Sequence, residues 1–365
     1  MTEPMLDPDD EIRRVAVIGS GVMGAGVAAH CANAGCEVIL LDIVCEGEED
    51  RNSIPRKAIQ DMLKADPEML MHKSFAKQII PGNLEDDLQK LEDCDWVIEA
   101  IVEDLEIKRS LYQNISQYIG TNTIVSSNTS TLPRSSLIQG MPEEMESRFL
   151  ITHFFNPPRY LPLLEVVSDS KVDGGLLSRL VDFADKSLGK RVIHCNDTPG
   201  FIGNRLGIFF IQRALSAAIE HDLTVEQADA MLGIPIGVPK TAVFGLMDLV
   251  GIDLVPHVIG SMLDHLPDDD PLHNFAGSGE EIIQRMIAEG YTGRKGKGGF
   301  YRLNKEGGKR VKEARNLKTG EYTPAERKAG FPSAKMGKQG LGQLMDYPDE
   351  GAAFVQDVLL DTLSY

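Results

Sequence analysis

Short apolar segments alternate with longer helix-like segments over residues 14–194. The apolar segments predict strands at residues 15–20, 37–42, 95–101, 123–128, 149–154, 163–167 and 191–194. Amphipathic patterns predict helices between several of them, at residues 22–34, 105–119 and 173–187. Strands that alternate with helices are typical of a largely parallel sheet in an α/β domain.

Two regions depart from this alternation. Residues 45–78 are too long and too polar for another strand–helix unit, so they predict a helical insertion after the second strand. Beyond residue 196 the pattern becomes helical, and its longest apolar stretch predicts a helix over 201–221. Shorter helical patterns at 224–233 and 281–290 each end at a glycine, which is a common helix stop.

These patterns divide the chain into three parts. We expect an α/β domain over 1–196, an all-helical domain over 197–302, and a polar, extended tail over 303–365 that ends in a helix. The last helix pattern, from about residue 351, reaches the final residue without a stop signal. We therefore expect the chain to be a fragment of a longer protein.

Composition and charge exclude several classes of partner. The formal net charge is −18, whereas nucleic-acid binding relies on clustered lysines and arginines, so we expect no nucleic-acid partner. No apolar stretch reaches the roughly 18 residues of a transmembrane helix, so we expect no membrane span. The five cysteines show neither CxxC spacing nor a histidine cluster, which predicts no metal site and reduced thiols in a cytoplasmic protein.

A glycine-rich turn follows the first predicted strand. The stretch VAVIGSGVMGAG contains the G-x-G-x-x-G pattern where a strand ends and a helix begins. Such glycines allow a tight turn and let a dinucleotide pyrophosphate approach the helix N-terminus. An acidic residue ending the second strand should hold the adenosine ribose, and no arginine follows it, which favours NAD over NADP. The predicted cofactor-binding residues of this Rossmann-like domain are Gly19, Gly21, Val22, Met23, Gly24 and Asp42.

Polar side chains follow the other strands, and one interrupts a strand. Ligands of open α/β sheets bind at the carboxyl ends of strands. We therefore expect Glu99, Glu103, His153 and the segment 127–130, which includes Ser130, to converge there with the glycine-rich turn and Asp42. Glu165 lies inside the apolar run LLEVV, and a buried carboxylate requires a partner, so we expect His153 to pair with it. A histidine held by a carboxylate is a common general base. Hydride transfer to a nicotinamide needs such a base for the substrate's hydroxyl proton.

The chain resembles the 3-hydroxyacyl-CoA dehydrogenase family through several motifs that occur in order. They are GSGVMGAGVA, DWVIEAIVEDLEIKRSLY, SSNTST, HFFNPPRYLPLLEV, DTPGFIGNR and GRKGKGGFY, which cover most of residues 14–302. The resemblance implies a Rossmann-like NAD domain followed by an all-α C-terminal domain of the family's type. It also implies NAD-dependent oxidation of (S)-3-hydroxyacyl-CoA to 3-ketoacyl-CoA in fatty-acid β-oxidation.

The same resemblance implies roles for individual residues. His153 resembles the family's catalytic base, Glu165 its paired carboxylate, and Ser130 the serine that contacts substrate and nicotinamide. Asn156 and Asn204 match asparagines that line the reacting carbonyl and the nicotinamide. The implied catalytic residues are therefore His153, Glu165, Ser130 and Asn204, and the implied substrate contacts are Ser130, Asn156 and Asn204. Further implied cofactor contacts are Glu103, Lys108, Ser130, Asn156 and Lys295.

Partners follow from the resemblance as well. The tail resembles the longer bacterial branch of the family, which implies a second helical repeat and a covalently fused enoyl-CoA hydratase-like region. The short members of the family imply a homodimer formed through the helical domain. An acyl-CoA substrate needs phosphate contacts, for which the nearest cations on the insertion are Arg51, Arg56, Lys57 and Lys64. We favour a solvated basic face over phosphate contacts as the interpretation of these cations.

Two other functions stay open. One is a related dehydrogenase that acts on a specialised CoA ester or a free hydroxy acid. The other is a catalytically silent NAD-binding module of a larger multifunctional protein. The complete set of Ser130, His153, Glu165 and Asn204 argues against the silent module, which has no need of these side chains.

Overall fold

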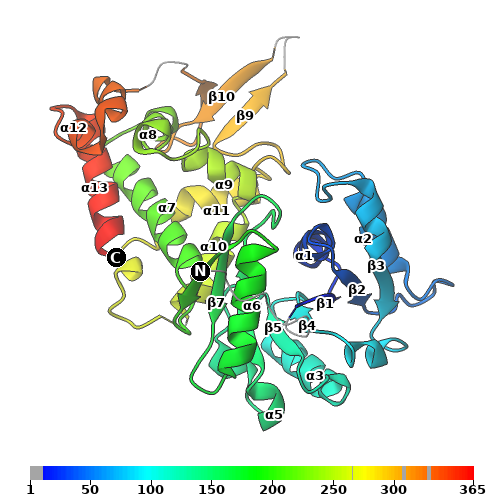
Figure 1. Cartoon of the computed structure of the whole chain (residues 1–365). Coiled ribbons are helices and arrows are strands. Elements are labelled where there is room, and N and C mark those ends of the chain that lie inside the picture. Colours follow the sequence, from blue (N-terminus) through cyan, green and yellow to red (C-terminus); the bar gives the residue numbers. More distant parts are fainter. Residues whose placement is uncertain (1–10, 265, 306–309, 327–329) are drawn as a thin grey trace. The chain divides into compact units, whose positions relative to one another are not determined.

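The computed structural model describes residues 11–264, 266–305, 310–326 and 330–365 (Figure 1). Parts of the predicted first domain and of the tail, at 1–10, 306–309 and 327–329, lie outside the described residues. The chain forms two compact units, Met1–Ile202 and Gly203–Tyr365. The boundary lies a few residues beyond position 196, and the backbone N–H of Ile202 still donates to Glu165 within the first unit.

An eight-stranded sheet forms the centre of the first unit. Its strands are β1 (Arg14–Ile18), β2 (Glu37–Asp42), β3 (Ile79–Asn83), β4 (Trp96–Glu99), β5 (Ile124–Ser127), β6 (Phe149–Phe154), β7 (Leu163–Val167) and β8 (Arg191–Cys195). They follow the spatial order β3-β2-β1-β4-β5-β6-β7-β8. All neighbours are parallel except β6 and β7, so β7 and β8 run against the rest. This confirms the predicted α/β fold class.

Helices cover both faces of this sheet. They are α1 (Val22–Asn33), α2 (Ser53–Met62), α3 (Leu105–Ile115), α4 (Arg134–Leu137), α5 (Glu143–Glu146) and α6 (Gly174–Lys186), with short 3-10 helices at Lys73–Gln78, Leu88–Leu91 and Ser116–Tyr118. Val15 and Val17 of β1 pack in a core cluster with α1 and α6. Ala16 and Ile18 pack in a second cluster with α3. The near-continuous apolar pattern of β1 follows from this burial on both faces.

Strand β3 differs from the sequence-based expectation, which placed no strand there. Its sequence IIPGN contains Pro81 and Gly82, and both residue types weaken a strand pattern. The strand lies at one edge of the sheet and pairs with β2. A proline has no N–H to donate, and an edge strand tolerates this because one of its sides has no ladder to complete.

The second unit is mainly helical. Its helices are α7 (Gly203–Glu220), α8 (Val225–Met231), α9 (Phe244–Val250), α10 (Leu254–Leu263), α11 (Glu280–Ala288), α12 (Leu341–Met345) and α13 (Glu350–Ser364), with 3-10 helices at Ile234–Ile236, Pro271–Asn274 and Pro332–Gln339. The last helix, α13, packs along α7 (Figure 1). Arg213 of α7 donates to Asp361 of α13 at 2.5 Å.

The predicted extended tail contains more structure than its polar sequence suggests. Strands β9 (Tyr301–Asn304), β10 (Val311–Arg315) and β11 (Tyr322–Pro324) form an antiparallel sheet in the order β11-β10-β9. The Arg315 side chain is buried, donates to Glu289 at 2.9 Å, and lies over the rings of Tyr291 and Tyr322. These contacts join residues far apart in sequence, so a local pattern does not predict them.

Neither a membrane-spanning helix nor a metal-binding cluster occurs among the described residues. No single helix there is long and apolar enough to cross a membrane, although α9 and α10, bent by 95°, meet the length and composition criteria together. No group of three or more His, Cys, Asp or Glu side chains in that part of the chain is arranged to hold a metal ion. All five cysteines are free.

Candidate active site

The antiparallel pairing of β6 with β7 brings the two unusual residues of the sequence together. His153 and Glu165 are direct cross-strand partners, and His153 Nδ1 lies 2.7 Å from Glu165 Oε2. Glu165 is fully buried and His153 is 6% exposed. The other carboxylate oxygen, Oε1, accepts from the N–H of Ile202 at 3.0 Å. Because the carboxylate engages Nδ1, Nε2 is the ring nitrogen that can exchange a proton with another molecule.

Apolar groups surround this pair. The His153 ring lies 4.5 Å from the Phe155 ring and 5.7 Å from the Phe201 ring, measured between centroids. Burial, and then the neighbouring Glu165 carboxylate, raise the pKa of the Cys195 thiol to about 11. Cys195 is therefore protonated at neutral pH and is a poor nucleophile. The histidine–carboxylate pair is the reactive arrangement at this edge of the sheet.

In the glycine-rich turn between β1 and α1, Gly19 and Gly24 are closely packed, whereas the space beside Gly21 is open. Gly19 has φ +99°, and a Cβ there would lie 2.5 Å from the carbonyl oxygen of Ala100. A Cβ on Gly24 would lie 1.8 Å from the Gly19 oxygen, whereas a Cβ on Gly21 meets nothing within 4 Å. Gly21 is the N-cap of α1, and no side chain caps that helix. The N–H groups at the start of α1, including those of Val22 and Met23, are therefore suited to an anion.

Asp42 ends β2 beside this turn. Its Oδ2 accepts from the Ser20 N–H at 2.7 Å and from the Ser20 hydroxyl at 2.5 Å. Exposed apolar side chains follow the neighbouring strands: Val22 after β1, Ile43 after β2 and Val102 after β4 are each more than 60% exposed. The carboxyl edge of β2, β1 and β4 thus combines a carboxylate, free helix N–H groups and apolar surface, which suit a ribose, a phosphate and a planar base.

The ends of β4, β5 and β6 are joined by hydrogen bonds. Glu103 Oε1 accepts from the N–H of Ser130 at 3.0 Å, and its Oε2 lies 3.3 Å from the ammonium of Lys108. Burial opposes ionisation of Glu103, but Lys108 and the hydrogen bonds from the 129–130 segment outweigh it and lower the pKa of Glu103. Asn128 accepts from the N–H of Phe154, next to His153. The predicted residues Glu103, Lys108 and Ser130 therefore lie together.

Of the three remaining predicted site residues, only Asn156 belongs to the first unit. Asn156 is exposed in the turn that follows β6. Asn204 is half-buried in the first turn of α7, and the exposed Lys295 forms an ion pair with Asp253 at 2.8 Å. Asn204 and Lys295 belong to the second unit, so their positions are described within that unit.

Sequence reasoning missed the residue that holds the glycine- and lysine-rich loop. Asp248 of α9 accepts from the N–H groups of Phe300 and Tyr301 at 2.7 and 2.8 Å, and burial raises its pKa to about 6. A Cβ on Gly299 would lie 1.9 Å from Asp248 Oδ1, so only glycine fits there. The sequence feature that could have identified Asp248 is its position as a lone carboxylate in the apolar helix FGLMDLV, because a buried carboxylate requires hydrogen-bond partners.

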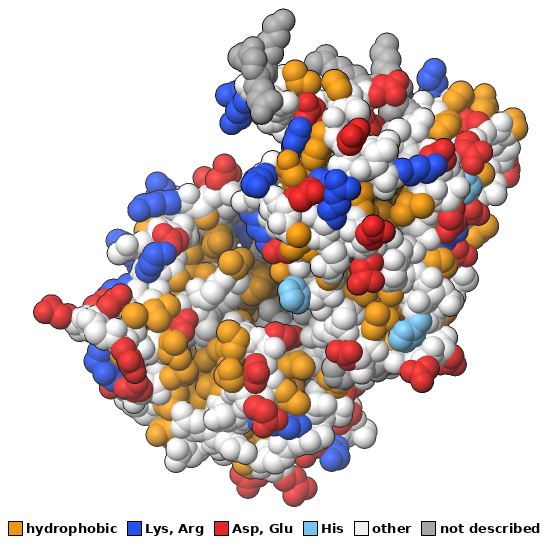
Figure 2. All heavy atoms as spheres, turned by 180° about the vertical axis from the view of Figure 1, so that it is seen from behind, with side chains coloured by type: hydrophobic (Ala, Val, Ile, Leu, Met, Phe, Trp, Pro, Cys, Tyr) orange, Lys and Arg blue, Asp and Glu red, His pale blue; other side chains and the backbone are white. Residues whose placement is uncertain are grey.

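Three of the four cations considered for phosphate contacts form ion pairs. Arg51 contacts Glu85 and Asp86, Arg56 contacts Asp50, and Lys57 contacts Asp61. Figure 2 likewise shows basic and acidic side chains next to one another on one face of the molecule. These pairs favour a solvated, mixed-charge face over a phosphate site at Arg51, Arg56 and Lys57.

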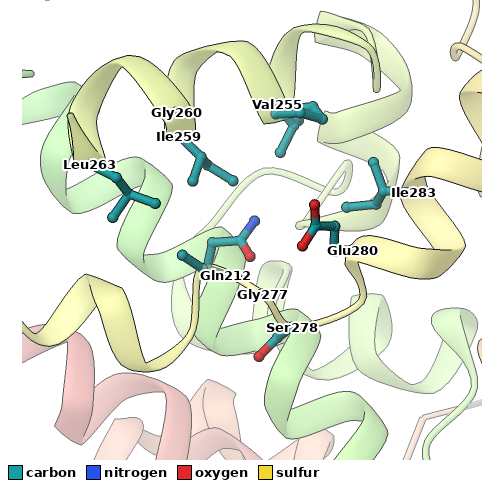
Figure 3. Close-up of a pocket in the computed structure, with 11 residues that line it drawn as sticks. Gln212, Val255, Ile259, Gly260, Leu263, Gly277, Ser278, Glu280 and Ile283 are labelled. Carbon is teal, nitrogen blue, oxygen red and sulfur yellow. The ribbon is translucent and has the colours of Figure 1, made fainter.

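A cavity of about 240 Å³ lies within the second unit (Figure 3). Its walls come from α7, α10, α11 and the segment before α11, and are largely apolar. The amide of Gln212 points into it, is buried, and has no hydrogen-bond partner among the described residues. None of the predicted site residues lines this cavity.

Comparison with known proteins gives two family matches that together cover most of the chain. Residues 14–198 match the family described as 3-hydroxyacyl-CoA dehydrogenase, NAD binding domain. Residues 200–303 match the family described as 3-hydroxyacyl-CoA dehydrogenase, C-terminal domain. The two matches meet close to the boundary between the two compact units.

Similar proteins include both long and short members. The chain is 43% identical over 318 residues to a "Putative fatty acid oxidation complex trifunctional enzyme" of Rickettsia felis, covering 87% of this chain but only 44% of that protein. It is 41% identical over 296 residues to a "Probable 3-hydroxyacyl-CoA dehydrogenase" of Deinococcus radiodurans, covering 81% and 84%. The solved structure of (S)-3-hydroxybutyryl-CoA dehydrogenase from Ralstonia eutropha matches with 26% identity and a TM-score of 0.61, covering 78% and 96%.

Proposed function

Since this chain belongs to the 3-hydroxyacyl-CoA dehydrogenase family, we propose that it catalyses the NAD-dependent oxidation of (S)-3-hydroxyacyl-CoA to 3-ketoacyl-CoA. The observation that carries the proposal is the buried pair of His153 and Glu165, with 2.7 Å between Nδ1 and Oε2. A family member without catalytic function would have no reason to bury an ionisable pair at the carboxyl edge of its sheet.

In the proposed reaction the chain handles the proton, and bound NAD accepts the hydride from C3 of the substrate. His153 Nε2 takes the proton of the 3-hydroxyl group. Glu165 holds Nδ1–H, fixes the tautomer in which Nε2 is a free base, and stabilises the imidazolium that forms. Ser130, Asn156 and Asn204 are proposed to position the substrate oxygen and the nicotinamide, because their hydroxyl and amide groups donate hydrogen bonds without titrating at neutral pH.

NAD fits the carboxyl edge of the first unit. The uncapped N-terminus of α1 suits the pyrophosphate, and the open space over Gly21 allows its approach. We propose that Asp42 accepts from the adenosine ribose hydroxyls. The Asp42 carboxylate is held in place by Ser20, and its negative charge would repel the 2′-phosphate of NADP. Lys295 is proposed as a further cofactor contact from the second unit.

Two glycine substitutions separate cofactor binding from folding. Gly21→Ala should weaken NAD binding by at least about tenfold, because the added methyl group occupies the space through which the pyrophosphate approaches the α1 N–H groups. The melting temperature should stay within about 2 °C of wild type, because that methyl group meets no protein atom within 4 Å. Titration calorimetry and thermal unfolding measure the two effects. As a control, Gly174→Ala at the start of α6 also adds a methyl group that meets no atom within 4 Å, and it should change neither NAD affinity nor melting temperature. Equal NAD affinities for the two variants would contradict the pyrophosphate site at Gly21.

The activity itself is tested with 3-ketoacyl-CoA substrates of C4 to C16 chain length. NADH oxidation should proceed on at least one chain length and should be much slower with NADPH. Turnover confined to a free keto acid or to an aromatic or alicyclic CoA ester would support the related dehydrogenase instead. If NADH binds and no substrate turns over, the silent NAD-binding module is the better description.

The biological setting is part of the proposal. The names of the Rickettsia relatives support a role in fatty-acid β-oxidation and a fused hydratase-like region, and the chain spans 44% of the length of these relatives. We further propose a cytoplasmic location, which suits five free cysteines. A homodimer formed through the helical unit is proposed by analogy with the short family members.

A further inference from the structure

A buried carboxylate that the proposed reaction does not use lies at the end of β4. Glu99 is fully buried and accepts four hydrogen bonds. Its Oε1 accepts from the Ile101 N–H at 2.8 Å and from the Lys108 ammonium at 2.5 Å. Its Oε2 accepts from the hydroxyl groups of Tyr112 and Ser127 at 2.5 and 2.6 Å. An ammonium and three further donors are the partners that a carboxylate, rather than a neutral carboxyl group, requires.

Lys108 connects Glu99 to the surface of the site. Its side chain is 1% exposed, so its ammonium is a fixed charge inside the first unit. The same ammonium lies 3.3 Å from a carboxylate oxygen of Glu103, whose side chain is 37% exposed. Glu103 in turn accepts from the Thr129 hydroxyl at 2.6 Å and from the Ser130 N–H at 3.0 Å. Glu99, Lys108 and Glu103 therefore form a chain of charges, here called the acidic triad, that runs from the core to the Ser130 loop.

The acidic triad carries a net charge of −1, since two carboxylates share one ammonium. Glu99 already pairs with Lys108 at the shorter distance, so the unbalanced negative charge lies at the exposed end, on Glu103. This end belongs to the loops that follow β4 and β5. A dinucleotide with its adenosine at β2 and its pyrophosphate at β1 extends across the crevice toward β4 and β5, which places its nicotinamide half over these loops.

The two redox states of nicotinamide differ in charge at this position. The oxidised ring is a cation, whereas the reduced ring is neutral. A fixed negative charge beside the ring stabilises the oxidised state selectively. We propose that Glu99 is a positioning residue which, by binding Lys108, sets the charge of the acidic triad and makes the site prefer NAD⁺ over NADH. The inference rests on NAD binding to this chain but requires no turnover.

The test is the ratio of two dissociation constants, Kd(NAD⁺)/Kd(NADH), measured by titration calorimetry on the full chain at pH 7. Glu99→Gln neutralises the acidic triad, so the ratio should rise about tenfold over wild type. Combining Glu99→Gln with Lys108→Met restores a net charge of −1 on Glu103, and the ratio should return to within about threefold of wild type. A merely structural role for Glu99 would weaken both cofactors equally and leave the ratio unchanged.

Two further variants distinguish an effect of charge on the ratio from an effect of structure. Tyr112→Phe removes a hydrogen bond to Glu99 without changing any charge, so the ratio should stay within about twofold of wild type. If Glu99→Gln does not fold, the exposed Glu103→Gln makes the same charge change and should also raise the ratio about tenfold. An unchanged ratio in the folded charge-neutral variant overturns the proposal. Because only binding is measured, this result is independent of whether the chain turns over any acyl-CoA.

Discussion

Replacing His153 with alanine is expected to lower kcat for 3-hydroxyacyl-CoA oxidation by roughly 10²–10⁴-fold. The alanine removes the base that accepts the hydroxyl proton. NADH binding, measured by cofactor fluorescence, should stay within about twofold of wild type, because His153 is not among the proposed NAD contacts, which are centred on Asp42 and the N-terminus of α1.

Two further variants control for structural effects of this change. The alanine variant leaves the buried Glu165 with one fewer donor, which costs stability. His153→Gln retains an amide donor toward Glu165, so it should fold with nearly wild-type stability and still lose turnover. His194→Ala removes an exposed histidine of β8 and should leave kcat within about twofold. Near-normal turnover in the folded glutamine variant would refute the assignment of His153 as the base.

The sequence predicts the central architecture well because its strongest signals are local. Strands β1, β2, β4, β5 and β6 are largely apolar runs, because burial on both faces of the sheet requires apolar side chains on both sides of a strand. The expected pairing of His153 with Glu165 is also present, since the turn between β6 and β7 makes these two residues cross-strand partners. Their catalytic roles stay predictions.

Other features could not be predicted because they depend on long-range contacts. Pro81 and Gly82 weaken the strand pattern of β3. The edge of the sheet tolerates them there, because an edge strand pairs on one side only. In the polar tail, which contains strands β9–β11, the Arg315 side chain contacts Glu289 and the rings of Tyr291 and Tyr322. Likewise, the sequence suggests a cofactor contact for Lys108 but not its burial between Glu99 and Glu103, which depends on how α3 packs on the sheet.

Glu165→Gln is the second substitution for which we expect a large effect, a fall in kcat of roughly 10²–10⁴-fold at nearly unchanged NAD affinity. Glu165 accepts at both oxygens, from His153 Nδ1 at 2.7 Å and from the Ile202 N–H at 3.0 Å. A glutamine offers one acceptor and one donor group. If its NH₂ faces Ile202, two donors oppose each other inside the core.

In the other orientation the NH₂ group faces His153 Nδ1 and stabilises the tautomer whose proton is on Nε2, so the ring cannot accept the substrate proton there. Both orientations remove the negative charge that stabilises the imidazolium, and the second also removes the tautomer in which Nε2 is a free base. The substitution changes almost no volume. Saturating oxidation kinetics on Glu165→Gln measure the loss, and Glu144→Gln, at an exposed carboxylate of α5, should show none. A loss of less than about fivefold in a folded Glu165→Gln protein would mean that Glu165 only fills space beneath His153.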